Sequence, residues 1–193
     1  MEITQQYLEE LKQDSINTAK AMELFDSNVL NHLRNETVVE VDYSERPKGN
    51  WYGQTICGAN LITVFDKNLS TLKISKLDNS ELATMLKEDN FIPEVIPQVI
   101  QVLRKVPKEL VFQLFNQSGM DHEILGHLSN YLAKKDWGEP AARQTQYDVA
   151  VFRSTQDPSW DLMVNLLPTA NRKIAESQDD IFNIPDIRDL VLF

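Results

Sequence analysis

The sequence contains little cysteine, histidine or glycine, and it has no long apolar run. Its single cysteine, Cys57, excludes an internal disulfide and a structural zinc site built from thiolates. No stretch approaches the ~20 apolar residues that span a bilayer, so we expect no membrane segment. Any metal site in this chain must therefore use imidazole and carboxylate ligands.

Basic residues are also scarce, because 19 lysines and arginines stand against 29 aspartates and glutamates. The resulting net charge of -10 opposes binding to a phosphate backbone, so we expect no nucleic-acid partner. The first six residues are polar and lack the basic and apolar regions of a secretion signal, which predicts a cytoplasmic location. A length of 193 residues suits one well-buried core, and we expect a single domain over residues 1–193.

Hydrophobic periodicity predicts an α+β fold that is mostly helical, with a small N-terminal sheet or hairpin followed by a helical region. Residues 7–33 carry apolar side chains at three- and four-residue intervals, which predicts one long amphipathic helix or two short ones. β-Branched runs predict a strand at 38–43 and a hairpin of 61–65 with 70–74. Further helices are expected at 80–87, 93–106, from 107 onward, through the histidine motif to about 135, at 139–154, after Pro158 and after Pro185.

The most informative stretch is His122-Glu123-Ile124-Leu125-Gly126-His127, which holds two of the three histidines. These histidines are five residues apart, whereas the familiar zinc-hydrolase motif places them four apart. On a regular helix a spacing of four separates two side chains by about 40°, and a spacing of five separates them by about 140°. A π-bulge, for which Gly126 is a suitable place, would return both histidines to one face.

The two helix geometries predict different chemistry. With a bulge, two neutral imidazoles can bind zinc while Glu123, on the adjacent face, serves as general base for a water whose pKa the metal lowers to roughly 7. With a regular helix, Glu123 and His127 form a surface pair four residues apart, worth only ~0.2–0.5 kcal/mol.

The hexapeptide 122–127 resembles the H-E-x-x-G-H motif of the dipeptidyl peptidase III family, which are zinc peptidases with a distorted active-site helix. The resemblance implies that His122 and His127 are zinc ligands and that Glu123 is the base. More widely, the chain resembles compact gluzincin-type zincins, in which a second helix supplies an acidic ligand. The resemblance thus implies a zincin-like domain with zinc as cofactor and a peptide or protein as substrate.

The third ligand is expected on the helix at 139–154. Glu139 is the leading candidate because of its carboxylate and the loose similarity of residues 139–143 to the second motif of that family. It lies at the start of its helix, however, about two turns from the level of His127 if the helices run antiparallel. Asp148 is the next candidate, and Gln146 is a less usual oxygen donor.

The sequence therefore favours a zinc-dependent peptidase in which Glu123 activates water and His122, His127 and Glu139 hold the metal. Two alternatives remain open: a non-enzymatic helical interaction protein, and a zincin scaffold that binds metal without efficient hydrolysis. Neither the oligomeric state nor the cleavage specificity follows from periodicity. The apolar C-terminus, residues 190–193, is expected to dock on the body of the protein.

Overall fold

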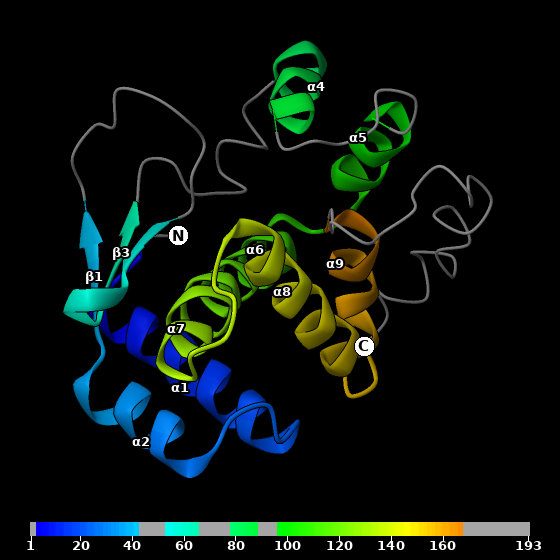
Figure 1. Cartoon of the computed structure of the whole chain (residues 1–193). Coiled ribbons are helices and arrows are strands. Elements are labelled where there is room, and N and C mark those ends of the chain that lie inside the picture. Colours follow the sequence, from blue (N-terminus) through cyan, green and yellow to red (C-terminus); the bar gives the residue numbers. More distant parts are fainter. Residues whose placement is uncertain (1–2, 43–52, 66–77, 89–95, 168–193) are drawn as a thin grey trace.

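The computed structural model describes residues 3–42, 53–65, 78–88 and 96–167 (Figure 1). Three predicted features lie outside these residues: the strand at 70–74, the helix after Pro185 and the docking of the C-terminus. In the described part of the chain, no helix combines the length and the apolar character that crossing a membrane requires.

The mostly helical α+β architecture is confirmed. The helices are α1 (Gln5–Ala21), α2 (Ser27–Glu36), α4 (Asn79–Glu88), α5 (Ile96–Lys105), α6 (Lys108–Met120), α7 (Asn130–Leu132), α8 (Glu139–Ser154) and α9 (Asp161–Leu166). Two short 3₁₀ turns, η1 (Cys57–Ala59) and η4 (Pro158–Trp160), and a π-helix, η3 (Asp121–Ser129), complete the helical segments. The strands are β1 (Val38–Asp42), β2 (Gly53–Ile56) and β3 (Leu61–Phe65).

The N-terminal helical region divides into two helices, one of the two outcomes that its periodicity allowed. The break lies between Met22 and Asp26, where Glu23 takes a left-handed φ of 54° that ends the first helix. Asp26 then caps α2 by accepting hydrogen bonds from two backbone amides of the first turn. The break is thus set by local capping.

The three strands form a mixed sheet in the order β1-β3-β2. β3 is central, because it pairs in parallel with β1 and antiparallel with β2. The hairpin at β3 is therefore made with the preceding strand, through η1 and Asn60, whose φ of 50° an asparagine tolerates. The sequence had left the segment that forms β2 unassigned, and β2 turns out to be the strand that contacts the π-helix.

One face of the sheet covers the core and the other faces solvent. Val39, Ile62 and Val64 are buried, whereas Val38 and Glu40 are exposed. The alternation matches the two-residue period of a half-buried sheet.

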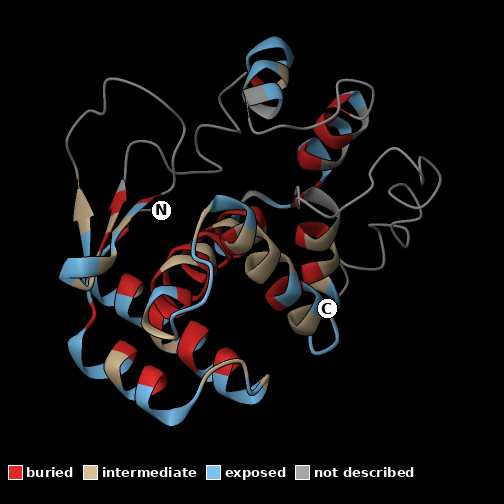
Figure 2. Ribbon diagram, in the orientation of Figure 1, coloured by how far each residue is buried: buried red, intermediate tan, exposed pale blue. Residues whose placement is uncertain are grey.

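Among the described residues, the buried side chains form two hydrophobic clusters, and Figure 2 shows the buried segments in red. The first joins α1, α2 and the sheet to the π-helix, and the second joins α4, α5 and α9. Helices α6 and α8 contribute to both, because Phe112 and Val149 belong to the first cluster while Leu114 and Ala150 belong to the second. These two helices therefore connect the two parts of the core.

A buried ion pair braces α8 against the start of the π-helix. Arg153 donates from Nε and Nη2 to the two oxygens of Asp121, over 3.0 and 3.1 Å, and the Asp121 side chain is only 1% exposed. Ser15 of α1 and Gln117 of α6 also donate to Asp121. Burial alone would lower the pKa of the Arg153 guanidinium, but Asp121 and Asp14 raise it. Asp121 therefore holds four helical segments together and does not orient either motif histidine.

Removal of Arg153 should destabilise the fold strongly. An Arg153→Leu variant leaves the Asp121 carboxylate buried without its cation, which should lower the free energy of unfolding by about 3–5 kcal/mol. Urea denaturation followed by circular dichroism measures this loss. The control is Arg34→Leu at an exposed position of α2, which should change stability by no more than about 0.5 kcal/mol. Equal small losses in the two variants would show that the ion pair does not brace the fold.

Candidate metal centre

The histidine motif lies in a π-helix, so the two histidines converge. Residues Asp121–Ser129 form nine residues of π-helix that continue directly from α6, with no break at Ser118 or Gly119. The Nε2 atoms of His122 and His127 lie 3.1 Å apart, and the two rings meet edge to face with centroids 4.7 Å apart. The distortion predicted near Gly126 is present, and it extends well beyond a single bulge.

The interior of the protein supports this unusual helix. Three side chains of the π-helix are fully buried in the first cluster: Ile124, Leu125 and Leu128. Their burial determines which faces of the π-helix pack against the core. The Ser129 hydroxyl donates to the carbonyl of Ile124, five residues earlier, over 2.6 Å. Side-chain packing and polar contacts thus replace the regular α-helical pattern as the source of stability.

Close packing at Gly126 brings α8 beside the motif. A Cβ atom placed on Gly126 would lie 2.8 Å from both Cα and Cβ of Ala142. Real side chains do not approach this closely, so the position requires glycine as long as α8 keeps its place. Ala142 follows Glu139 by less than one helical turn, and this contact therefore sets the position of Glu139 relative to the histidines.

Glu139 completes a cluster with the two histidines. Its carboxylate oxygens lie 3.6 Å from Nε2 of His122 and 3.4 Å from Nε2 of His127. The nearby imidazoles of His122 and His127 hold the pKa of the Glu139 carboxyl well below its ordinary value, and Arg143 lowers it further. Of the described His, Cys, Asp and Glu side chains, these three form the one group whose possible ligand atoms gather within 4.8 Å.

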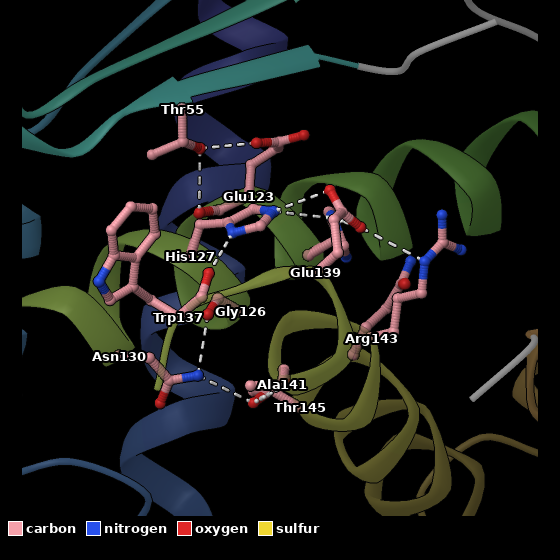
Figure 3. A network of polar contacts seen from close by, with 12 residues as sticks. Thr55, Glu123, Gly126, His127, Asn130, Trp137, Glu139, Ala141, Arg143 and Thr145 are labelled. Carbon is pink, nitrogen blue, oxygen red and sulfur yellow. Dashed lines mark hydrogen bonds and ion pairs between the residues drawn. The ribbon is translucent and has the colours of Figure 1, made fainter. Parts of the chain in front are cut away.

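The expected offset of two turns between Glu139 and His127 was wrong. The π-helix ends at Ser129 and α7 at Leu132, and residues 133–138 lead back so that α8 begins beside the motif (Figure 3). Glu139 keeps its side chain 61% exposed, so the cluster is accessible from this side. Arg143, one turn later, lies 3.3 Å from the same carboxylate and adds a positive charge beside it.

His127 is held in one tautomer by the backbone. Its Nδ1 lies 2.7 Å from the carbonyl oxygen of Trp137, which can only accept, so Nδ1 carries a proton. In the neutral ring, Nε2 then has a free lone pair directed at the cluster. Burial opposes the charged ring, but the bonds to Glu139 and Trp137 raise the pKa of His127 above its ordinary value. Nδ1 of His122 is also buried, and no described residue bonds to it.

Glu123 lies on the side of the motif that faces the sheet. It is only 6% exposed, and its Oε2 accepts a 2.6 Å hydrogen bond from the hydroxyl of Thr55 in β2 (Figure 3). The same hydroxyl lies 3.2 Å from the Glu123 carbonyl oxygen. Thr55 therefore fixes both the backbone and the carboxylate of the proposed base, while Oε1 remains for another partner.

The two lower-ranked candidates for the third ligand point elsewhere. Asp148 accepts a hydrogen bond from Gln144 on the exposed face of α8. Gln146 donates to both the carbonyl and the hydroxyl of Ser118 in α6. Tyr147, the next residue of α8, packs against the second hydrophobic cluster. Among the candidates on α8, the structure brings only Glu139 to the histidines.

Thr55 and the Trp137 carbonyl did not emerge from the sequence. Thr55 could have been found only by recognising residues 53–56 as a strand beside the motif, and their short, mixed pattern does not indicate one. A carbonyl group has no sequence signature. Burial, and to a smaller extent the charge of Glu123, raises the pKa of the Cys57 thiol.

Introducing a methyl group at Gly126 should separate the two helices. A Gly126→Ala variant should lose about 1–3 kcal/mol of stability from overpacking against Ala142, and a crystal structure should show Glu139 moved away from the histidines. Gly58→Ala is the matched control, because no heavy atom lies within 4 Å of a Cβ placed there. An unchanged stability and an unmoved α8 in Gly126→Ala would contradict the packing argument.

Comparison of the chain with models of protein families, with curated proteins and with solved structures finds no match. The likeness to the dipeptidyl peptidase III family is therefore carried only by the hexapeptide 122–127 and the loose similarity of residues 139–143. The geometry of His122, His127, Glu139 and Glu123 is what supports a function.

Proposed function

We propose that this protein is a zinc-dependent peptidase whose metal is held by His122, His127 and Glu139. One observation carries the proposal. Two ligands at zinc–ligand distances of about 2.0–2.1 Å in a tetrahedron lie about 3.3 Å from each other. The two Nε2 atoms lie 3.1 Å apart, and each faces a different oxygen of Glu139, with Oε2 at 3.6 Å from His122 and Oε1 at 3.4 Å from His127. These spacings are close to the one that a tetrahedral ion would need.

The chemistry of the donors favours zinc over other common ions. Magnesium and calcium prefer oxygen ligands, whereas two imidazoles and one carboxylate form a ligand set of catalytic zinc sites. Three protein ligands also leave the fourth tetrahedral position free for water or substrate. The proton on Nδ1 of His127 supports the assignment, because a metal-binding imidazole commonly donates its other N–H to a carbonyl or carboxylate.

In the proposed hydrolysis, the metal and the residues around the cluster have different roles. Bound zinc would lower the pKa of a water to roughly 7 and polarise the scissile carbonyl. Glu123 would accept a proton from water at Oε1, because Thr55 occupies Oε2, and would return it to the leaving amine. Arg143 stays beside Glu139, where its charge adds to the larger effect of the two histidines in favouring the ionised carboxylate.

Peptides or proteins as substrates, and the cytoplasm as the compartment, belong to this proposal and follow the expectations from the sequence. The alternative of a scaffold that binds metal without hydrolysis differs from it only in the role of Glu123. A non-enzymatic interaction protein differs in needing no metal. Two experiments separate these possibilities.

The first experiment measures zinc. The purified protein should retain one zinc per chain by mass spectrometry, and zinc at 100 times its dissociation constant should stabilise the fold by about 2.7 kcal/mol. The His122→Ala, His127→Ala double variant should lose both effects. Glu139→Ala should weaken zinc binding by at least ~100-fold, because loss of a residue that only supports a metal ligand already weakens binding by up to about 100-fold.

Asp148→Ala on the same helix is the control for Glu139→Ala, because its carboxylate faces away from the cluster. It should bind zinc as tightly as the unchanged protein. A wild-type protein that holds no stoichiometric zinc and gains no stability from added zinc would rule out the proposed function. Equal losses in the two variants on α8 would rule out Glu139 as the specific ligand.

The second experiment tests Glu123. A Glu123→Gln variant keeps the shape of the side chain and an oxygen for Thr55, but it cannot accept the proton from water. It should retain zinc and hydrolyse a mixed pool of short peptides roughly 10²–10⁴-fold more slowly, as followed by mass spectrometry. Equal rates for the variant and the wild type would exclude Glu123 as the base. Zinc binding with no hydrolysis by either protein would support the scaffold alternative.

A further inference from the structure

The three proposed ligands come from two different helical segments, so their spacing depends on how these segments are aligned. His122 and His127 belong to η3, whereas Glu139 belongs to α8. The separations of 3.1–3.6 Å leave little room for sliding of one segment along the other. Contact at Gly126 and Ala142 limits how closely the segments approach, but a methyl-to-backbone contact does not by itself fix their alignment.

A polar bridge links the same two segments on the other side of this contact (Figure 3). The amide nitrogen of Asn130 lies 2.8 Å from the carbonyl oxygen of Gly126 and 3.1 Å from the hydroxyl of Thr145 in α8. That hydroxyl donates in turn to the carbonyl of Ala141, over 3.1 Å. Asn130 is 6% exposed, so these bonds are formed away from solvent.

The donors and acceptors of this bridge match one for one. The Asn130 amide has two hydrogens, and each has one acceptor, the Gly126 carbonyl or the Thr145 hydroxyl. The Thr145 hydroxyl accepts one bond and donates the other. Because hydrogen bonds weaken steeply with misalignment, a chain of this kind favours one alignment of the segments over neighbouring ones.

The bridge ends close to the ligands at both sides. Gly126 immediately precedes His127, and Ala141 lies two residues after Glu139. We infer that Asn130 and Thr145 are positioning residues which align α8 with the π-helix and thereby hold Glu139 at binding distance from the two histidines. This inference rests on the proposed function, because it assigns the two residues to the same metal centre.

Thr145→Val is the sharpest test, because it keeps the shape of the side chain and removes the hydroxyl. It should weaken zinc binding by roughly 10–100-fold in competition with a chelator, as altered residues around metal ligands do. The visible spectrum of the cobalt(II)-substituted protein should change as well, because the geometry of the ligands changes. Thr145→Ser restores the hydroxyl and should restore both the affinity and the spectrum.

The chain offers a matched control for each variant. Thr84 makes the same hydroxyl-to-carbonyl bond at an exposed position of α4, so Thr84→Val should bind zinc as tightly as the wild type. Asn116 makes the same buried amide-to-carbonyl bond in α6, away from the metal centre. Asn130→Asp should therefore weaken zinc binding more than Asn116→Asp, even where both variants lose stability.

The outcomes separate this inference from the proposed function. Wild-type affinity and an unchanged cobalt spectrum in Thr145→Val would overturn the inference and leave the zinc site standing. If the wild type binds no zinc, the proposed function fails. Hydrogen exchange of the metal-free protein then tests whether Thr145 aligns α8 with the π-helix. Thr145→Val should then speed exchange of the backbone amides of residues 143–147 relative to Thr84→Val, and unchanged exchange would overturn the inference.

Discussion

The close contact between Gly126 and Ala142 is the constraint on which the candidate metal centre depends. It allows α8 to lie against the π-helix so closely that Glu139 meets both histidines. A larger residue at either position would push α8 away from the π-helix. The π-helix belongs to the first hydrophobic cluster, whereas α8 contributes to both clusters. The Asp121–Arg153 pair secures the far end of the same interface, so α8 is fixed near both of its ends.

Sequence reasoning identified the residues of the cluster because their chemistry is rare in this chain. With three histidines in 193 residues, two beside one glutamate indicate a site, and the spacing of five implies the helical distortion that the structure contains. Glu139 was ranked first by its chemistry and by the motif resemblance. The boundaries of α8 were also predictable, because a proline in the first turn and an amphipathic pattern define them.

The features that could not be predicted from the sequence depend on tertiary contacts. The length of the π-helix depends on packing of buried side chains and on Ser129, neither of which alters the apolar pattern. The distance of Glu139 was misjudged because an ideal antiparallel pair of helices was assumed, whereas the chain between Leu132 and Glu139 folds back sharply. Thr55 reaches Glu123 from a strand that is distant in sequence, and only the folded sheet brings the two together.

The π-helix also has an evolutionary consequence. Two histidines that are five residues apart in this helix converge as a pair four residues apart would in a regular α-helix. One inserted residue can therefore be absorbed by the helix without loss of the convergent pair, provided that a neighbouring segment leaves space and glycine is available at the contact. A search restricted to one spacing between histidines would pass over such a site, although its donor atoms and their arrangement are the same.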